Sequence, residues 1–170
     1  MSVPTFTAQV LLIRPAGFGF NPESAASNGF VRADASTDLA AAARREFDAM
    51  VAALARADLD PLVWDEPAAR AHPDAVFPNN WISTHPGGQV HLYPMEAVSR
   101  RAEVDPGLIA ELRRRFTISE LIDWTPHAAD GRYLEGTGSL VLDARRSKTA
   151  RFALQPSILP TAGIRLSLEF

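Results

Sequence analysis

The pattern of apolar and polar positions along the chain predicts short strands separated by two amphipathic helices. Five segments are strand candidates, because they are too short for helices and carry short apolar runs or alternating apolar residues. They lie at 10–13, 62–64, 90–93, 118–122 and 140–142. Trp81-Ile82 precedes the turn residues Pro86-Gly87-Gly88, so it is predicted to form a hairpin with residues 90–93.

Two longer segments carry apolar residues at helical spacing. The first presents one apolar face, is capped by Ser36 or Thr37 and has Asp38 in its first turn; its apolar positions are Leu39, Ala43, Phe47, Met50, Val51 and Leu54. The second begins at Asp105-Pro106, where Asp caps and Pro suits the first helical position, and its stripe is Leu108, Ile109, Leu112 and Phe116. Residues 16–30 and 65–76 are predicted loops. The order of elements indicates a mixed α/β fold, with each helix followed by a strand.

Composition narrows the class of protein. The 170 residues suffice for one domain, and 17 basic against 20 acidic residues argue against a nucleic-acid partner. No apolar run approaches the ~20 residues of a membrane helix, and the N-terminus lacks a signal-like pattern. We therefore expect a cytoplasmic protein with no membrane partner. The absence of cysteine excludes disulfides and thiolate metal sites within this sequence, and we expect no metal or cofactor.

Glu135 and an asparagine pair are the leading candidates for chemistry. Glu135 precedes Gly136-Thr137-Gly138, where the backbone can turn sharply and a ligand can approach closely. A carboxylate there could hold a planar cation in bidentate fashion. Asn79 and Asn80 are adjacent amides that could accept from such a cation or bind a carboxylate. An exposed glutamate on a turn and an Asx turn before a strand explain the same patterns.

The four histidines are His72, His85, His91 and His127. His85 follows the asparagine pair closely and could face the same cleft, His72 is expected to be exposed, and His91 could point to either face of its strand. Each is more often structural than catalytic. Ser83 beside a histidine could imitate a Ser–His arrangement, but no nucleophile-elbow motif supports it.

Several segments together carry a resemblance to a known family. They are residues 12–23, residues 25–28, Pro73 to His85, Leu92-Tyr93-Pro94-Met95 with Arg100-Arg101, and Leu134 to Val141. In their order and spacing, across about residues 8 to 146, the chain resembles the amidinotransferase-like branch of the guanidino-group-modifying superfamily, the penteins. That superfamily includes arginine deiminases, dimethylarginine hydrolases and glycine amidinotransferases. We expect residues 1–146 to be the N-terminal part of such a domain.

The resemblance implies an α/β-propeller of five ββαβ-type units, of which this chain would supply about half. It implies that a cysteine thiolate attacks the carbon of an arginine-like guanidinium. Glu135 matches the guanidinium-binding carboxylate, and Asn80 falls where deiminases commonly have an aspartate. The loop at Phe20 and Asn21 looks like the family's substrate-covering loop, and we add Asn79 and His85 as substrate-binding candidates.

The departures from the family pattern are equally specific. Members carry a histidine in the second half and a cysteine near the C-terminus, whereas this chain has no cysteine and no histidine after His127. We expect residues 147–170 to be a divergent tail, from a frameshift or truncation. Three interpretations stay open: an enzyme fragment inactive alone, a non-catalytic binding pseudoenzyme, or a half-subunit that pairs with another polypeptide. Exposed half-propeller surfaces predict self-association.

Overall fold

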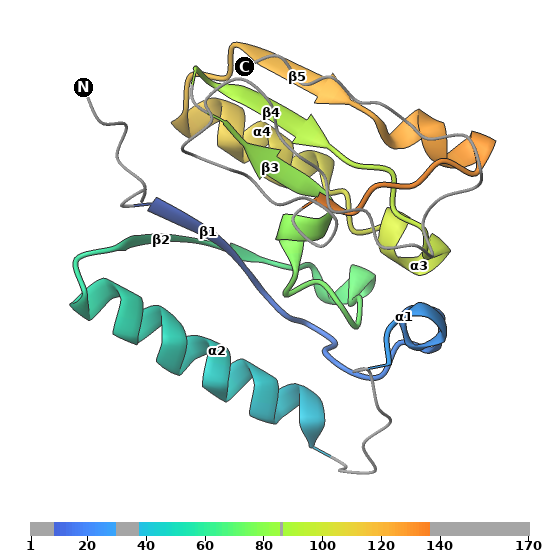
Figure 1. The fold of residues 1–170 in the computed structure, drawn as a ribbon. Coiled ribbons are helices and arrows are strands. Elements are labelled where there is room, and N and C mark those ends of the chain that lie inside the picture. Colours follow the sequence, from blue (N-terminus) through green and yellow to red (C-terminus); the bar gives the residue numbers. More distant parts are fainter. Residues whose placement is uncertain (1–8, 30–37, 86, 137–170) are drawn as a thin grey trace. The chain divides into compact units, whose positions relative to one another are not determined.

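The computed structural model describes residues 9–29, 38–85 and 87–136, and these fall into two compact units (Figure 1). The first unit spans residues 1–78 and the second spans residues 79–170. Each is described by itself below. The predicted caps Ser36 and Thr37, the predicted strand at 140–142 and the predicted tail at 147–170 lie outside the described residues.

The first unit is built on two parallel strands joined through a long helix. Strand β1 (Gln9–Arg14) pairs in parallel with β2 (Asp60–Asp65), and helix α2 (Leu39–Arg56) connects them. Parallel neighbours require such a crossover. Arg14 holds the helix to the sheet: its Nε donates to Asp48 Oδ1 at 2.9 Å, it also pairs with Asp65, and its guanidinium lies 5.8 Å from the Phe47 ring centroid.

Two predictions for this unit were wrong in detail. The predicted loop at 16–30 contains a short helix, α1 (Pro22–Ser27), because the Asn21 side chain caps it and Pro22 occupies its first position. Asp38 is the N-cap of α2 rather than a first-turn residue, and its side chain makes no capping hydrogen bond. The predicted apolar face of α2 buries Phe47, whereas Met50 is 43% exposed.

The second unit contains a hairpin followed by a helical crossover to a third strand. Strand β3 (Ile82–Thr84) pairs antiparallel with β4 (Gln89–Leu92), and β4 pairs in parallel with β5 (Glu120–Asp123). Helices α3 (Val98–Arg101) and α4 (Pro106–Arg115) lie in the crossover. This confirms the predicted hairpin. A Cβ at Gly88 (φ +85°) would lie 2.5 Å from the Thr117 carbonyl oxygen, so the turn requires glycine there.

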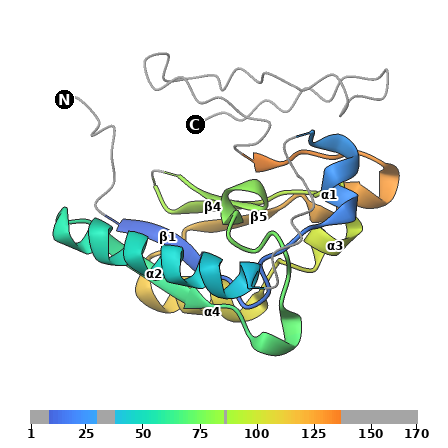
Figure 2. The ribbon, with the colours of Figure 1, turned by 90° about the horizontal axis from the view of Figure 1, so that it is seen from below.

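Helix α4 runs along one face of this sheet in both views (Figures 1 and 2). Its predicted start is confirmed, since Asp105 accepts from the Gly107 N–H at 2.7 Å and Pro106 is the first helical residue. Leu108 and Leu112 of the predicted stripe are buried. Trp81, expected to begin the strand, is a fully buried turn residue that precedes β3.

Three short 3-10 helices complete the described structure, at Ala68–Arg70, Pro78–Asn80 and Thr125–Asp130. The mixed α/β class expected from the sequence is therefore present in both units. Within the described ranges, none of the helices combines the length and the apolar character needed to cross a membrane.

Candidate functional site

The asparagine pair and the Glu135 segment, distant in sequence, meet in the second unit. Gly136 has φ +33°, and a Cβ built on it would lie 2.2 Å from the Asn79 carbonyl oxygen and 3.0 Å from that of Asn80. Such contacts leave no room for any side chain. Glycine at position 136 thus allows the backbone after Glu135 to press directly against Asn79 and Asn80.

Backbone groups of residues 94–96 also hold the Glu135 segment. Its Oε1 accepts from the Glu96 N–H at 3.4 Å, and the Leu134 N–H donates to the Pro94 carbonyl at 2.9 Å. Leu134 is buried, whereas Glu135 is half-buried. The Asn79 Nδ2 donates to Asn80 Oδ1 at 3.0 Å, so the two amides are aligned with each other. The backbone beside a half-buried carboxylate therefore lies against the backbone of two adjacent amide residues. Carboxylate and amide oxygens are groups able to accept N–H donors.

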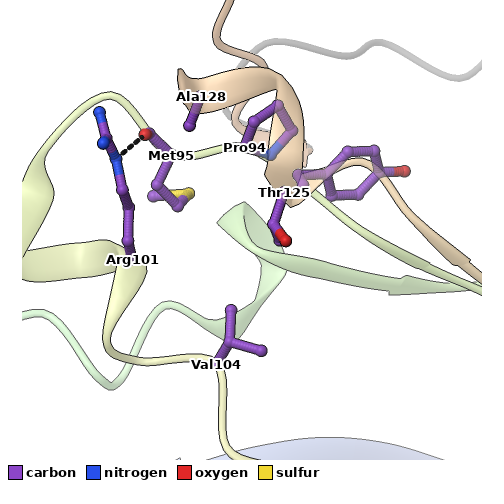
Figure 3. Close-up of a pocket in the computed structure, with 7 residues that line it drawn as sticks. Pro94, Met95, Arg101, Val104, Thr125 and Ala128 are labelled. Atoms are coloured by element: carbon purple, nitrogen blue, oxygen red, sulfur yellow. Dashed lines mark hydrogen bonds between the residues drawn. The ribbon is translucent and has the colours of Figure 1, made fainter. Parts of the chain in front are cut away.

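A small cavity lies beside the segment that contacts Glu135. It has a volume of about 250 Å³ and is lined by Tyr93, Pro94, Met95, Arg101, Val104, Thr125 and Ala128 (Figure 3). Arg101 reaches along its edge and donates to the Met95 and Glu96 carbonyls, at 2.9 Å each. The sequence resemblance included Arg101 only as one half of an arginine pair and gave it no role.

His85 directly follows β3 and belongs to a cluster that we call the histidine face. The members of this cluster are Ser83, His85, His91, Tyr93 and Trp124. The His85 Nε2 is 2.7 Å from Ser83 Oγ, which is itself 2.7 Å from Tyr93 Oη. Ser83 therefore does contact a histidine, an arrangement that the sequence allowed but did not predict. Burial and, to a smaller extent, the neighbouring His91 together lower the pKa of His85 to about 4, so His85 is neutral at pH 7.

His91 occupies the centre of the histidine face. The strand register pairs it with Ser83, and Trp124 Nε1 donates to its Nδ1 at 3.1 Å. Its Nε2 is buried and has no hydrogen-bond partner in the part of the chain that the structure describes. Burial lowers the pKa of His91, with Glu120 opposing the shift. The alternation of residues along β4 could not show which face of the sheet His91 occupies. The pairing of His91 with Ser83 in the β3–β4 register shows that both lie on the same face.

Phe20 and Asn21 belong to the first unit. Phe20 is 43% exposed, while Asn21 is buried. The Asn21 Oδ1 accepts from the Glu23 N–H at 3.0 Å, and its Nδ2 donates to Asp74 Oδ2 at 2.8 Å. Asp74 also accepts from Ser24 Oγ at 2.7 Å. Sequence reasoning gave Asp74 no role, because it lies in the predicted loop at 65–76 and only the structure shows that it is buried. A buried carboxylate needs polar partners, which Asn21 and Ser24 supply.

The other histidines take structural positions. His72 was expected to be exposed, but its side chain is only 18% exposed and its Nδ1 lies 2.7 Å from Glu66 Oε1. The ring of His127 stacks at 6.0 Å from that of Trp124. No group of three or more metal-ligating side chains occurs among the residues placed by the structure.

Two comparisons found proteins that are similar to this chain. The family model described as N,N dimethylarginine dimethylhydrolase, eukaryotic, matches residues 14–156. A solved dimethylarginine dimethylaminohydrolase, a histidine-to-glycine variant in adduct with S-methyl-L-thiocitrulline, superimposes with a TM-score of 0.53 at 19% identity. The match covers 79% of this chain and 46% of that one, so this chain spans about half its length. At this identity the likeness shows a shared fold. No curated protein sequence matches the chain.

Proposed function

This chain belongs to the eukaryotic-type N,N dimethylarginine dimethylhydrolase family, and on that premise we propose that it binds an arginine-like guanidino compound through Glu135, Asn79 and Asn80. The family consists of hydrolases that modify guanidino groups. The observation that carries the proposal is the close approach of Gly136, the residue after Glu135, to the backbone carbonyls of Asn79 and Asn80, which brings the two segments together.

The chemistry of a guanidinium fits this set. It is planar, cationic and rich in N–H donors, and a carboxylate satisfies two of those donors in parallel. Glu135 is the acceptor with a full negative charge, and the Asn80 side chain adds a neutral one. The proposal assigns substrate contacts to Asn79, Asn80 and Glu135, with His85 as a further contact in the same unit. Phe20 and Asn21 of the first unit are separate candidates for contact with the substrate.

Turnover by the mechanism that the resemblance implies needs a cysteine, which this sequence does not contain. In the mechanism that the resemblance implies, a thiolate adds to the guanidinium carbon, an amine leaves with a proton, and water releases the product. Because the chain has no cysteine, we propose that cysteine and histidine come from polypeptide outside this sequence. A non-catalytic binding protein, or a half-subunit that pairs with a second polypeptide, is the alternative.

The proposed architecture is about half of a five-unit propeller, with residues 1–146 as the family domain and residues 147–170 as a divergent segment. The ββαβ order of the second unit and the 46% coverage of the solved structure support the half-propeller. Self-association through uncovered sheet surfaces and a cytoplasmic location stay predictions. Translating the gene in all three frames around residue 146 tests the proposed boundary.

Calorimetry with arginine and with dimethylarginine tests ligand binding. We expect saturable binding that E135Q weakens about tenfold or more, since hydrogen bonds to a charged group contribute about 1.5–3 kcal/mol. E120Q is the matched control: it removes one charge from the same unit at an exposed strand position bonded to Gln89. Equal affinities for E135Q and E120Q, or no binding at all, would refute the proposal.

A release assay tests the statement about turnover. The chain alone is expected to release no amine or ammonia from the bound compound. Release that persists in the chain alone and disappears in S83A would instead identify the Ser83–His85 pair as the nucleophilic site.

A further inference from the structure

We propose that Arg101 is a positioning residue for Glu135. Its guanidinium fixes the carbonyls of Met95 and Glu96, and the Glu96 N–H in turn meets Glu135 Oε1. The inference rests on the proposed function, because Glu135 is the ligand-binding group that Arg101 positions. It nevertheless concerns the geometry of the empty site, so it can be tested without any ligand.

The first step is the grip of Arg101 on two successive carbonyls. Its Nε donates to Met95 O and its Nη2 donates to Glu96 O, both at 2.9 Å (Figure 3 shows the Met95 contact). Two donors of one rigid, planar, charged group fix the orientation of the peptide group that joins Met95 to Glu96. The Glu96 N–H belongs to that same peptide, so the direction in which it points is set by Arg101.

The second step joins this segment to the residues around Glu135. The Leu134 N–H donates to Pro94 O at 2.9 Å, next to the Glu96 contact with Glu135. Arg101 also contacts the segment that carries Glu135: its Cζ lies 5.4 Å from the ring centroid of Tyr133, within the range of a cation–π contact. Arg101 therefore touches both the segment that donates to Glu135 and the segment that carries it.

The neighbouring arginine shows that this role is particular to Arg101. Arg100 is buried and pairs with Glu103 through two hydrogen bonds, at 2.9 and 3.0 Å. Arg101 makes no ion pair with a carboxylate in the described part of the chain, and both of its hydrogen bonds go to backbone carbonyls. Its hydrogen bonds thus orient backbone rather than neutralise a charge.

The test follows the amide proton at position 96 by NMR, with E96Q as the background so that this position has no titrating carboxyl of its own. In the full chain, the position 96 amide shift is expected to show a titration step caused by Glu135. The double variant E96Q/E135Q lacks the Glu135 carboxyl, so the loss of the step in this variant assigns the step to Glu135. E96Q/R101M is expected to lose the step while the ring signals of the histidine face stay dispersed.

E96Q/R114M is the matched control, because Arg114 is an exposed arginine of the same unit that pairs with Glu111; it is expected to keep the step. If R101M fails to fold, R101K keeps the charge and the alkyl stem but not the two-pronged donor, and the step should again be lost. A folded R101M or R101K with an unchanged step would overturn the proposal. Failure of the proposed function would instead appear as absent arginine binding with the titration intact.

Discussion

The two units use related strand–helix–strand plans but hold them together differently. Helix α2 in the first unit has 18 residues and fully buries only Phe47. Helix α4 in the second has 10 residues and buries both Leu108 and Leu112. The second unit has a hairpin strand that widens its sheet to three strands. Helix length is therefore a poor guide to packing: what counts is the sheet surface available to cover.

The ion pairs of the two units differ in how exposed they are to solvent. Arg14 bridges Asp48 and Asp65, and Asp74 binds Asn21 and Ser24. The second unit adds a buried ion pair and the histidine face to an apolar core. Exposed ion pairs contribute little to stability, whereas buried ones are costly to break. The predictions below test this contrast between the units, starting with the largest expected effect.

The largest difference in free energy of unfolding between the two units is expected when one partner of an ion pair is removed from each. E103A removes the carboxylate that accepts two hydrogen bonds from the Arg100 cation. Because these side chains are only 6% and 2% exposed, the loss should cost about 3–5 kcal/mol. D48A breaks the Arg14 contact, in which the side chains are 27% and 57% exposed, and should cost under ~1 kcal/mol. Urea unfolding measures both, and equal costs would contradict the contrast.

Truncating one apolar side chain on each helix should give the next largest difference. L108A creates a cavity at a fully buried position of α4 and should destabilise by about 2–5 kcal/mol. M50A removes a side chain of α2 that is 43% exposed and should stay within about 0.5 kcal/mol. The free energy of unfolding from denaturant titration decides this. A large cost for M50A would mean that α2 packs more tightly than its exposure indicates.

Acid should weaken the second unit through the histidine face. Burial holds the pKa of His85 at about 4, so between its unfolded value near 6.5 and about 4 the unfolded state binds more protons than the folded state. Stability should therefore fall as the pH drops through this window, by less than the full shift implies because His85 is partly exposed. Thermal melts of the wild type and H85N between pH 4 and 7 test this, and H85N should show the shallower dependence.

Helix caps should give the smallest difference. D105A removes a side chain that accepts from the Gly107 N–H and should cost about 1 kcal/mol. D38A removes an N-cap residue whose side chain makes no capping hydrogen bond, so its cost should be close to zero. Both are read from the same urea titrations, and a D38A cost as large as that of D105A would show that Asp38 stabilises α2 by another route.

Local sequence signals predicted most of the elements. Asp105-Pro106 marked the start of α4, and Pro86-Gly87-Gly88 marked the hairpin, because caps and turns depend on residues adjacent in the chain. The same kind of signal at Asn21-Pro22 was obscured by a stretch rich in glycine, asparagine and serine, so α1 was missed. Burial was less predictable: Met50 and Phe47 share an apolar pattern on one helix, but only Phe47 is buried.

The sequence by itself determined the mixed α/β class, the two helices that are each followed by a strand, and the family, together with the candidates Glu135, Asn79 and Asn80. Only the tertiary structure decided that Gly136 presses against the asparagine carbonyls, that His91 joins Ser83 on one face, and that Arg101 holds the segment beside Glu135. The physical reason is range. Turns, caps and periodicity arise from neighbouring residues, whereas these contacts join segments distant in sequence through strand register and close packing.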